Sequence, residues 1–306
     1  MIIPDYFKKK ITIVFEDKGE KWLADLPEIF EKCIDKWDLT DLKISQDLSF
    51  NYVCFAKSPE FGDVALKIGV PYPELYTEME ALTLYNGGDI CLCYDLDREL
   101  GALLLERILP GGDLNTVEDQ TTKVEIAAEL MANLPIEIEE NEKLPSYSDW
   151  IERGFKTARM KREEMGEELL TLVDRAEKLY QKILAQGGSK ALLHGDLHHK
   201  NILQDQEGNW RAIDPKGVVG LPCMDTARFI ENHIELVEDE EGSLTEMIQI
   251  ISNKVGETER TIASALVVDA VLSTVWQVED NADPEDMPYY IGKCQFFLNH
   301  LNQLDG

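Results

Sequence analysis

The first third of the chain alternates between strand patterns and helical patterns. Apolar residues recur at helical spacing over residues 20–37, where Pro27 is an early-turn residue or a kink. A second helix is predicted over residues 73–86 and is stopped by Gly87 and Gly88. Alternating or short continuous apolar runs predict strands over residues 42–44, 50–55, 63–68, 90–94 and 101–105. These patterns predict a small sheet with a helix lying on it.

The remainder of the chain is mostly helical. An apolar strand over residues 103–109 ends in the break Pro110-Gly111-Gly112, and helical spacing dominates after Thr116. Helices are predicted over residues 117–134, 150–184, 227–237, 243–254, 258–279 and 288–301. One strand-and-turn stretch, residues 192–217, interrupts them. The fold class predicted is α+β, with the sheet in a smaller first part and the helices in a larger second part.

Composition and charge narrow the range of partners. The chain has 306 residues, 44% of them hydrophobic, and we find no apolar run of about 18 residues, so we expect no membrane span. The start lacks a secretory signal pattern and the six cysteines are scattered, which favours a cytoplasmic protein. The formal net charge of −29 disfavours nucleic acid and anionic membranes. It fits either a cationic ligand or simply a solvated acidic surface.

Residues 192–217 contain the chemistry. The stretch predicts a short strand, a sharp loop at His194-Gly195-Asp196, a strand from Asn201, and a hairpin that returns the chain to Asp214. The hairpin therefore brings Asp214 back near Asn201 and Asp196. Phosphoryl transfer depends mainly on positioning and on Mg²⁺ held by oxygen ligands, as in the catalytic and metal-binding loops of protein kinases. We expect Asp196 to accept the substrate hydroxyl proton, and Asn201 and Asp214 to hold metal ions.

The motifs in this stretch resemble one kinase family. HGDLHHKNIL followed by AIDPKGVVGLP looks like the protein-kinase-like superfamily of small-molecule kinases, and AIDPKG is most similar to the aminoglycoside/hydroxyurea phosphotransferase family, the streptomycin 6-kinase group. Protein kinases have Asp-Phe-Gly where this chain has Asp214-Pro215-Lys216. The resemblance implies a bilobal fold. Residues 1–108 would form the nucleotide-binding lobe, and residues 109–306 the catalytic and substrate-binding lobe.

The resemblance also implies a nucleotide site in the first lobe. Lys67, in an apolar strand, is either a surface lysine or the lysine that binds the ATP phosphates, and Glu78 is favoured over Glu80 as its partner. Ser49 lies in the turn that replaces a glycine-rich phosphate loop. The run LLLERILPGG resembles the hinge whose backbone binds the adenine edge, and we take Glu106 and Ile108 from it as candidates.

Further residues follow from the same resemblance. His198 is either a donor to the transferring phosphate or a loop histidine with a structural role. Asp225 resembles a buried aspartate that braces the catalytic loop, whereas Leu221 departs from the Gly-Asp-Pro that relatives have there. Glu231 and Glu235 line the substrate pocket if the substrate is a polycation, but they fit surface charge equally well.

The function predicted is an ATP- and Mg²⁺-dependent transfer of phosphate to a hydroxyl of a small molecule. The family makes an aminoglycoside such as streptomycin the expected acceptor, consistent with the acidic charge. Two alternatives stay open. One is a metabolic kinase for an amino alcohol or a sugar, and the other is a catalytically silent, kinase-like binding protein. Four residues argue against the silent protein, because all of them are present: Lys67, Asp196, Asn201 and Asp214.

Overall fold

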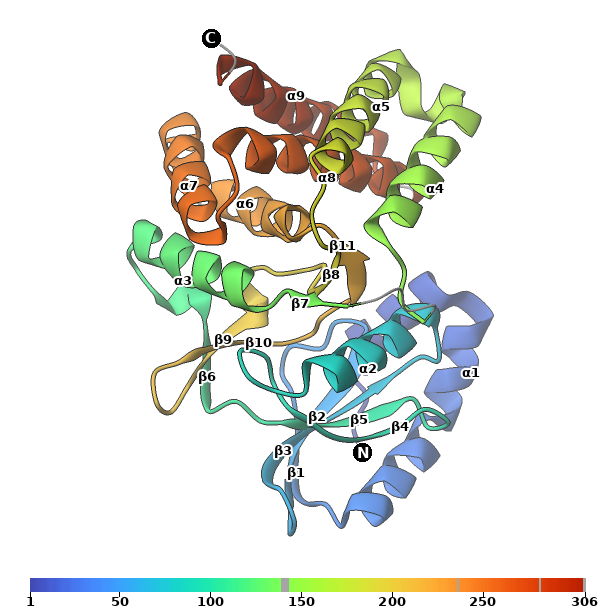
Figure 1. Cartoon of the computed structure of the whole chain (residues 1–306). Coiled ribbons are helices and arrows are strands. Elements are labelled where there is room, and N and C mark those ends of the chain that lie inside the picture. The colour runs from blue at the N-terminus through green and yellow to red at the C-terminus, as the bar shows by residue number, and fades with distance from the viewer. Residues whose placement is uncertain (139–142, 236, 281, 305–306) are drawn as a thin grey trace. The chain divides into compact units, whose positions relative to one another are not determined.

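The chain folds into two compact units in the computed structural model, which describes residues 1–138, 143–235, 237–280 and 282–304. Unit 1 comprises Met1–Gly111 and Gln204–Arg211, and unit 2 comprises Gly112–Leu203 and Ala212–Gly306. The N-terminal part contains an antiparallel sheet with two helices, and the rest is mostly helical, so the predicted α+β class is confirmed (Figure 1). The division after residue 108 into a nucleotide-binding lobe and a catalytic lobe concerns function and stays a prediction.

The sheet of unit 1 has five strands in the order β1-β2-β3-β5-β4. Their bounds are β1 Thr40–Ile44, β2 Asn51–Ser58, β3 Gly62–Gly69, β4 Cys93–Asp97 and β5 Ala102–Glu106. Neighbouring strands pair antiparallel, and Lys67 of β3 lies between Val53 of β2 and Leu103 of β5. The central strands β2, β3 and β5 carry the buried side chains of the core, including the fully buried Leu66 and Leu104.

Helix α1, Asp5–Trp37, is longer than the predicted helix and is broken at a different residue. Its backbone leaves the helical region at Glu16 (φ 48°, ψ −134°), whereas Pro27 stays inside the helix. Gly19 permits the turn, because a Cβ atom there would lie 2.6 Å from the carbonyl oxygen of Ile11. The two helical segments therefore pack closely on each other. The polar run after Phe15 hides this from the hydrophobic pattern.

Of the two remaining elements with a clear prediction in unit 1, strand β4 differs in its bounds and helix α2 agrees. Strand β4 begins three residues later than predicted, because the fully buried Ile90 lies outside that strand. Its acidic residues face α1 instead: Asp95 accepts a hydrogen bond from Trp37 Nε1 at 2.8 Å, and Asp97 accepts one from the Lys36 amine at 2.8 Å. Helix α2, Pro73–Tyr85, matches the predicted helix and ends at Asn86 in the left-handed conformation.

Short strands in and around unit 2 form two further sheets. Their bounds are β6 Pro110–Asp113, β7 Ile136–Glu137, β8 Ala191–Leu193, β9 Ile202–Asp205, β10 Trp210–Ala212 and β11 Val218–Gly220. One sheet has the order β10-β9-β6, and the other has the order β11-β8-β7. Strands β8, β9 and β10 are the elements that residues 192–217 predict. They hold the loop that contains Asp196.

The helices of unit 2 follow the predicted order. Their bounds are α3 Gln120–Asn133, α4 Tyr147–Met160, α5 Arg162–Ala185, α6 Ala227–Ile234, α7 Glu240–Val255, α8 Glu259–Glu279 and α9 Met287–Gln303, with short 3-10 helices at Leu114–Thr116, His199–Asn201, Pro222–Thr226 and Pro284–Asp286. The helical stretch predicted over residues 150–184 is not continuous. It is divided at Lys161 into α4 and α5, and α5 is broken again at Gly166 (φ 73°, ψ 159°). Helix α4 starts earlier than predicted because Ser146 and Asp149 form a capping box.

Helix α8 is the central helix of unit 2. It is long and apolar enough to cross a membrane, but 78% of its most apolar window is buried among the other helices. Helices α5, α6 and α9 lie around it in Figure 1. We therefore interpret α8 as the core helix of a globular unit.

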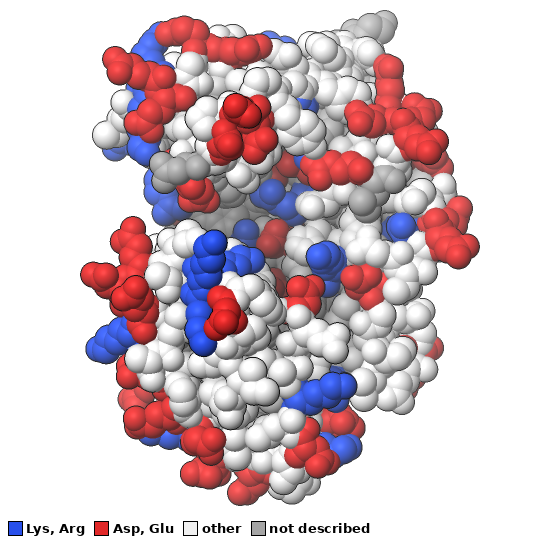
Figure 2. Space-filling view, turned by 180° about the vertical axis from the view of Figure 1, so that it is seen from behind, with Lys and Arg blue, Asp and Glu red and all other residues white. Residues whose placement is uncertain are grey.

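Acidic side chains are spread widely over the surface. Figure 2 shows one face, on which Asp and Glu side chains are distributed with Lys and Arg among them. On this face the Asp and Glu side chains do not gather in a single patch. A solvated acidic surface is therefore sufficient to explain the charge seen there.

Candidate active site

The first group of predicted residues lies in unit 1 and centres on a buried ion pair. Lys67 Nζ lies 2.5 Å from Glu78 Oε1, and the two side chains are only 7% and 6% exposed. Strand β3 presents Lys67 inward and helix α2 presents Glu78 toward it, so the pair predicted from the sequence is present. Glu80 instead binds Arg98 at 3.0 Å. Burying two charges costs free energy unless they are well paired, so a buried pair of this kind often serves function more than stability.

Three other predicted nucleotide-site residues also lie in unit 1. Ser49 is exposed in the turn between β1 and β2, and Ile108 is buried just after β5. The Glu106 carboxylate accepts a hydrogen bond from the backbone N–H of Leu92 at 3.0 Å and binds Arg211 at 3.0 Å. The side chain of Glu106 therefore anchors the segment that contains Arg211. Any role of this residue in adenine binding rests on its backbone.

The second group lies in unit 2, on a loop that Asp225 supports. The carboxylate of Asp225 is 2% exposed and accepts the backbone N–H groups of His194 at 2.8 Å and Gly195 at 2.7 Å. Gly195 has φ 78°, and a Cβ atom there would lie 2.9 Å from Val218 Cγ1. Glycine is therefore required at the bend that precedes Asp196.

A short chain of hydrogen bonds brings the predicted catalytic and metal-binding residues together. Asn201 Nδ2 donates to the carbonyl oxygen of Asp196 at 3.0 Å, and the carbonyl oxygen of Asn201 accepts the N–H of Ile213 at 2.9 Å. Ile213 directly precedes Asp214, so Asp214 returns to the same loop. The turn there is tight, because Asp214 has φ 62°, a conformation that aspartate tolerates better than most residues.

The donor set suits a hard divalent cation. Because Nδ2 of Asn201 is engaged by Asp196, the amide oxygen is the atom of that side chain left for a ligand. Asp214 supplies a carboxylate. Magnesium prefers oxygen ligands of these two kinds, often shared with substrate phosphates. The residues present therefore fit a Mg²⁺ ion, which neutralises charge on the phosphates when it is bound.

The carboxylate of Asp196 is surrounded by positive charge. Lys216 Nζ lies 3.5 Å from Oδ2, and Arg228 Nε lies 3.7 Å from Oδ1. Burial acts to raise the pKa of Asp196, but the surrounding positive groups, of which Lys216 and Arg228 are the strongest, together lower it. Asp196 is therefore ionised at neutral pH and is able to accept a hydrogen bond from a hydroxyl.

Sequence reasoning missed both cations. Lys216 lies inside the motif AIDPKG, but the resemblance implied no role for it. Arg228 comes from α6, and only the packing of that helix brings it to Asp196.

The histidines beside Asp196 have different surroundings. His198 is partly exposed, and burial lowers its pKa against the opposing charge of Asp196, so its ring is neutral at neutral pH. His199 is buried, hydrogen-bonded to His233 at 2.9 Å and stacked on Phe229. His199 is thus part of the core, whereas a role for His198 at the phosphate stays a prediction.

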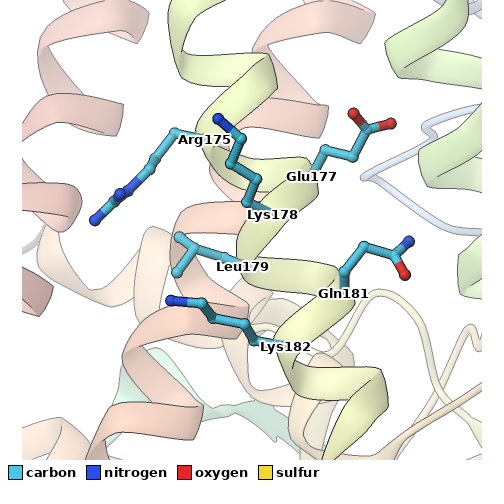
Figure 3. Close-up of a pocket in the computed structure, with 6 residues that line it drawn as sticks. All are labelled: Arg175, Glu177, Lys178, Leu179, Gln181 and Lys182. Atoms are coloured by element: carbon cyan, nitrogen blue, oxygen red, sulfur yellow. The ribbon is translucent and has the colours of Figure 1, made fainter.

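One surface groove holds none of the predicted residues. A groove of about 430 Å³ lies on α5 and is lined by residues of that helix only (Figure 3). Its charged side chains, among them Arg175 and Lys178, extend from the helix surface in different directions (Figure 3). Nothing in this groove brings chemical groups together as the loop of Asp196 does.

Comparisons with known proteins identify the family. The family model described as aminoglycoside/hydroxyurea antibiotic resistance kinase matches residues 65–281. The chain is 23% identical to a streptomycin 6-kinase of Streptomyces glaucescens over 97% of both chains. It is 26% identical to a hydroxyurea phosphotransferase of Kitasatospora aureofaciens, over 86% of this chain and 76% of the relative.

Solved structures agree on the fold. A choline kinase of Streptococcus pneumoniae matches with a TM-score of 0.62 and 17% identity, over 91% of this chain and 99% of the other. The aminoglycoside phosphotransferase APH(4)-Ia also matches with a TM-score of 0.62, at 13% identity, over 90% of this chain and 99% of the other. The predicted protein-kinase-like fold is confirmed. This chain is a small-molecule kinase that belongs to the aminoglycoside/hydroxyurea antibiotic resistance kinase family.

Proposed function

We propose that this kinase uses Mg-ATP to phosphorylate a hydroxyl of a small molecule, with an aminoglycoside such as streptomycin as the first acceptor to test. The observation that carries the proposal is the loop that holds Asp196, Asn201 and Asp214 together through hydrogen bonds to backbone carbonyl oxygens. Relatives that act on streptomycin and on hydroxyurea support the choice of acceptors.

The residues of unit 2 have separate roles in the proposed reaction. The acceptor hydroxyl donates a hydrogen bond to Asp196 and transfers its proton to that carboxylate as its oxygen bonds to the γ-phosphorus. The bond between the γ-phosphorus and the bridging oxygen breaks, and ADP leaves. Asn201 and Asp214 would hold Mg²⁺ on the phosphates. His198, with a neutral ring, would donate a hydrogen bond to the phosphoryl oxygens.

The residues of unit 1 would bind the nucleotide. The Lys67 ammonium, held by Glu78, would bind the α- and β-phosphates of ATP. Ser49 and nearby backbone amides would contact the phosphates, and the backbone near Glu106 and Ile108 would bind the adenine edge. Residues 1–108 would thus act as the nucleotide-binding lobe, and residues 109–306 as the catalytic lobe. All six cysteines are free thiols, which supports a location in the reducing cytoplasm.

The test is ADP release with Mg-ATP against streptomycin, hydroxyurea, amino alcohols and sugars, with Asp196→Ala as the blank. Streptomycin-dependent turnover that the variant lacks would support both the mechanism and the acceptor. Turnover with an amino alcohol or a sugar alone would keep the mechanism and replace the acceptor. Nucleotide binding without turnover on any acceptor would favour the silent binding protein.

A further inference from the structure

A polar pocket in unit 2 opens beside the proposed base. It has a volume of about 160 Å³ and lies between α6, α8 and α9. Its walls include Arg228, Glu231, Glu235, Ser273, Gln277 and Lys293. Every one of these residues belongs to the same unit as Asp196. Apart from the effect of Arg228 on Asp196, the proposed catalytic roles involve no residue of this pocket.

Arg228 connects the pocket to Asp196. Its Nε atom lies 3.7 Å from Asp196 Oδ1, and its Nη2 atom lies 3.4 Å from Asp269 Oδ2. Asp269 is 1% exposed and also accepts a hydrogen bond from the Tyr147 hydroxyl at 3.4 Å. One side chain therefore separates the pocket from the proposed base, and Asp269 fixes that side chain in place.

The acidic groups of the pocket are already compensated. Lys293 Nζ lies 2.6 Å from Glu235 Oε1 and 3.8 Å from Glu231 Oε2, and Arg228 balances Asp269. Burial raises the pKa of Glu231 against the opposing charge of Arg228, and the neighbouring Asp269 adds to the rise through its charge and a side-chain hydrogen bond. This shift favours the neutral carboxyl form of Glu231, and Lys293 pairs with Glu235, so the pocket offers no uncompensated carboxylate to a cation.

Hydrogen-bonding groups in the pocket are left open instead. The buried Oγ atom of Ser273 has no hydrogen-bond partner among the residues that the structure describes. Asn232, Gln277 and Tyr290 add amide and hydroxyl groups at the pocket wall. Buried polar groups are normally satisfied, so an open set beside a reacting residue indicates a ligand.

We infer that this pocket binds a neutral part of the acceptor that carries hydroxyl or amide groups, next to the hydroxyl that is phosphorylated. The inference rests on the proposed function, because it takes Asp196 as the base. It means that the cationic groups of an aminoglycoside lie outside this pocket. The volume of about 160 Å³ suits a fragment of one ring or a small neutral molecule such as hydroxyurea.

Blocking the pocket at its exposed rim tests its location. Gln277 is exposed, so Gln277→Trp should fold normally, and we expect it to raise the KM of the acceptor at least tenfold while leaving the KM of ATP unchanged. Gln249→Trp, an exposed glutamine on α7 away from the pocket, should change neither value. The probes are hydroxyurea, myo-inositol and streptomycin, each followed by turnover and by calorimetric binding. Unchanged KM values and affinities in Gln277→Trp contradict the location, as does the absence of turnover and binding with all three probes.

Replacing Lys293, which pairs with Glu235, tests whether the pocket binds a neutral or a cationic group. Lys293→Met leaves Glu235 without its ion pair, so we expect weaker binding of a neutral acceptor and tighter binding of streptomycin. Weaker binding of streptomycin with unchanged binding of the neutral probes would overturn the inference. Failure of the proposed function has a different signature, since Asp196→Ala would then turn over as fast as the wild type in the same assay.

Discussion

Asp225 offers the sharpest test of how the fold builds the catalytic loop, through the variant Asp225→Asn. The wild-type carboxylate accepts two backbone N–H groups, from His194 at 2.8 Å and Gly195 at 2.7 Å, while 2% exposed. Asparagine keeps one accepting oxygen, but its amino group then faces an N–H donor. The variant therefore loses one charge-assisted hydrogen bond, weakens the other and buries an unpaired donor.

The size of the effect follows from these contacts. A hydrogen bond to a charged group contributes about 1.5–3 kcal/mol, and an unsatisfied buried donor costs about 1–3 kcal/mol. Burial raises the pKa of Asp225, so part of the wild-type hydrogen-bond energy offsets the cost of desolvating its charge. We therefore use the lower ends of both energy ranges. We expect unit 2 to lose about 3 kcal/mol, which corresponds to a fall of roughly 6–12 °C in Tm for a unit of this size.

The measurement is thermal unfolding followed by circular dichroism, with turnover measured below the transition. Asp174→Asn is the matched control, because that carboxylate is largely exposed and its ion pair with Arg159 contributes about 1 kcal/mol or less. We expect Asp225→Asn to melt lower and to turn over more slowly than the control. Melting within about 2 °C of the wild type, with full turnover, would refute the role of Asp225 in holding the loop.

Three further predictions test other parts of the structure. Lys67→Met should raise the KM of ATP at least tenfold, whereas Glu80→Gln should leave it unchanged; equal effects in steady-state kinetics would contradict the choice of ion pair. Gly195→Ala should lower both Tm and kcat, because the position has φ 78° and no room for a Cβ atom, and wild-type values in both would argue against it. His233 is buried and burial lowers its pKa from 6.5 to about 4, so the unfolded chain binds more protons between these pH values and stability falls as pH falls through them. His233→Gln should remove up to about 1.4 kcal/mol of that loss per pH unit, measured by urea unfolding at several pH values; an unchanged slope would contradict this.

The catalytic loop was predictable because its geometry is local. Asp196, Asn201 and Asp214 lie within one strand-turn-strand stretch, so spacing along the chain fixes which residues approach each other. The choice of Glu78 over Glu80 was predictable for a similar reason, since the helical phase of α2 sets which side chain points toward β3. The first prediction required only the positions of the turns within residues 192–217, and the second required only the periodicity of a helix.

The contacts made by tertiary packing were not predictable. Arg228 reaches Asp196 only because α6 packs where it does, and nothing in the pattern of residues 227–237 marks it. The break between α4 and α5 at Lys161 was missed because charged residues continue through it without a proline. Strand β4 was placed too early because the buried Ile90 looks like a strand residue in the hydrophobic pattern.

The central claim is that Asp196 acts on the acceptor and Asp214 on Mg-ATP. The measurement that tests it most directly is calorimetric binding of Mg-ATP to Asp196→Ala and Asp214→Ala, with turnover measured on the same samples. We expect Asp196→Ala to bind Mg-ATP within a few-fold of the wild type while its kcat falls about 100-fold or more, since a general base contributes about 10²–10⁴-fold. We expect Asp214→Ala to lose most of its affinity for Mg-ATP. Wild-type turnover in both variants, or loss of Mg-ATP binding in Asp196→Ala alone, would contradict the assignment.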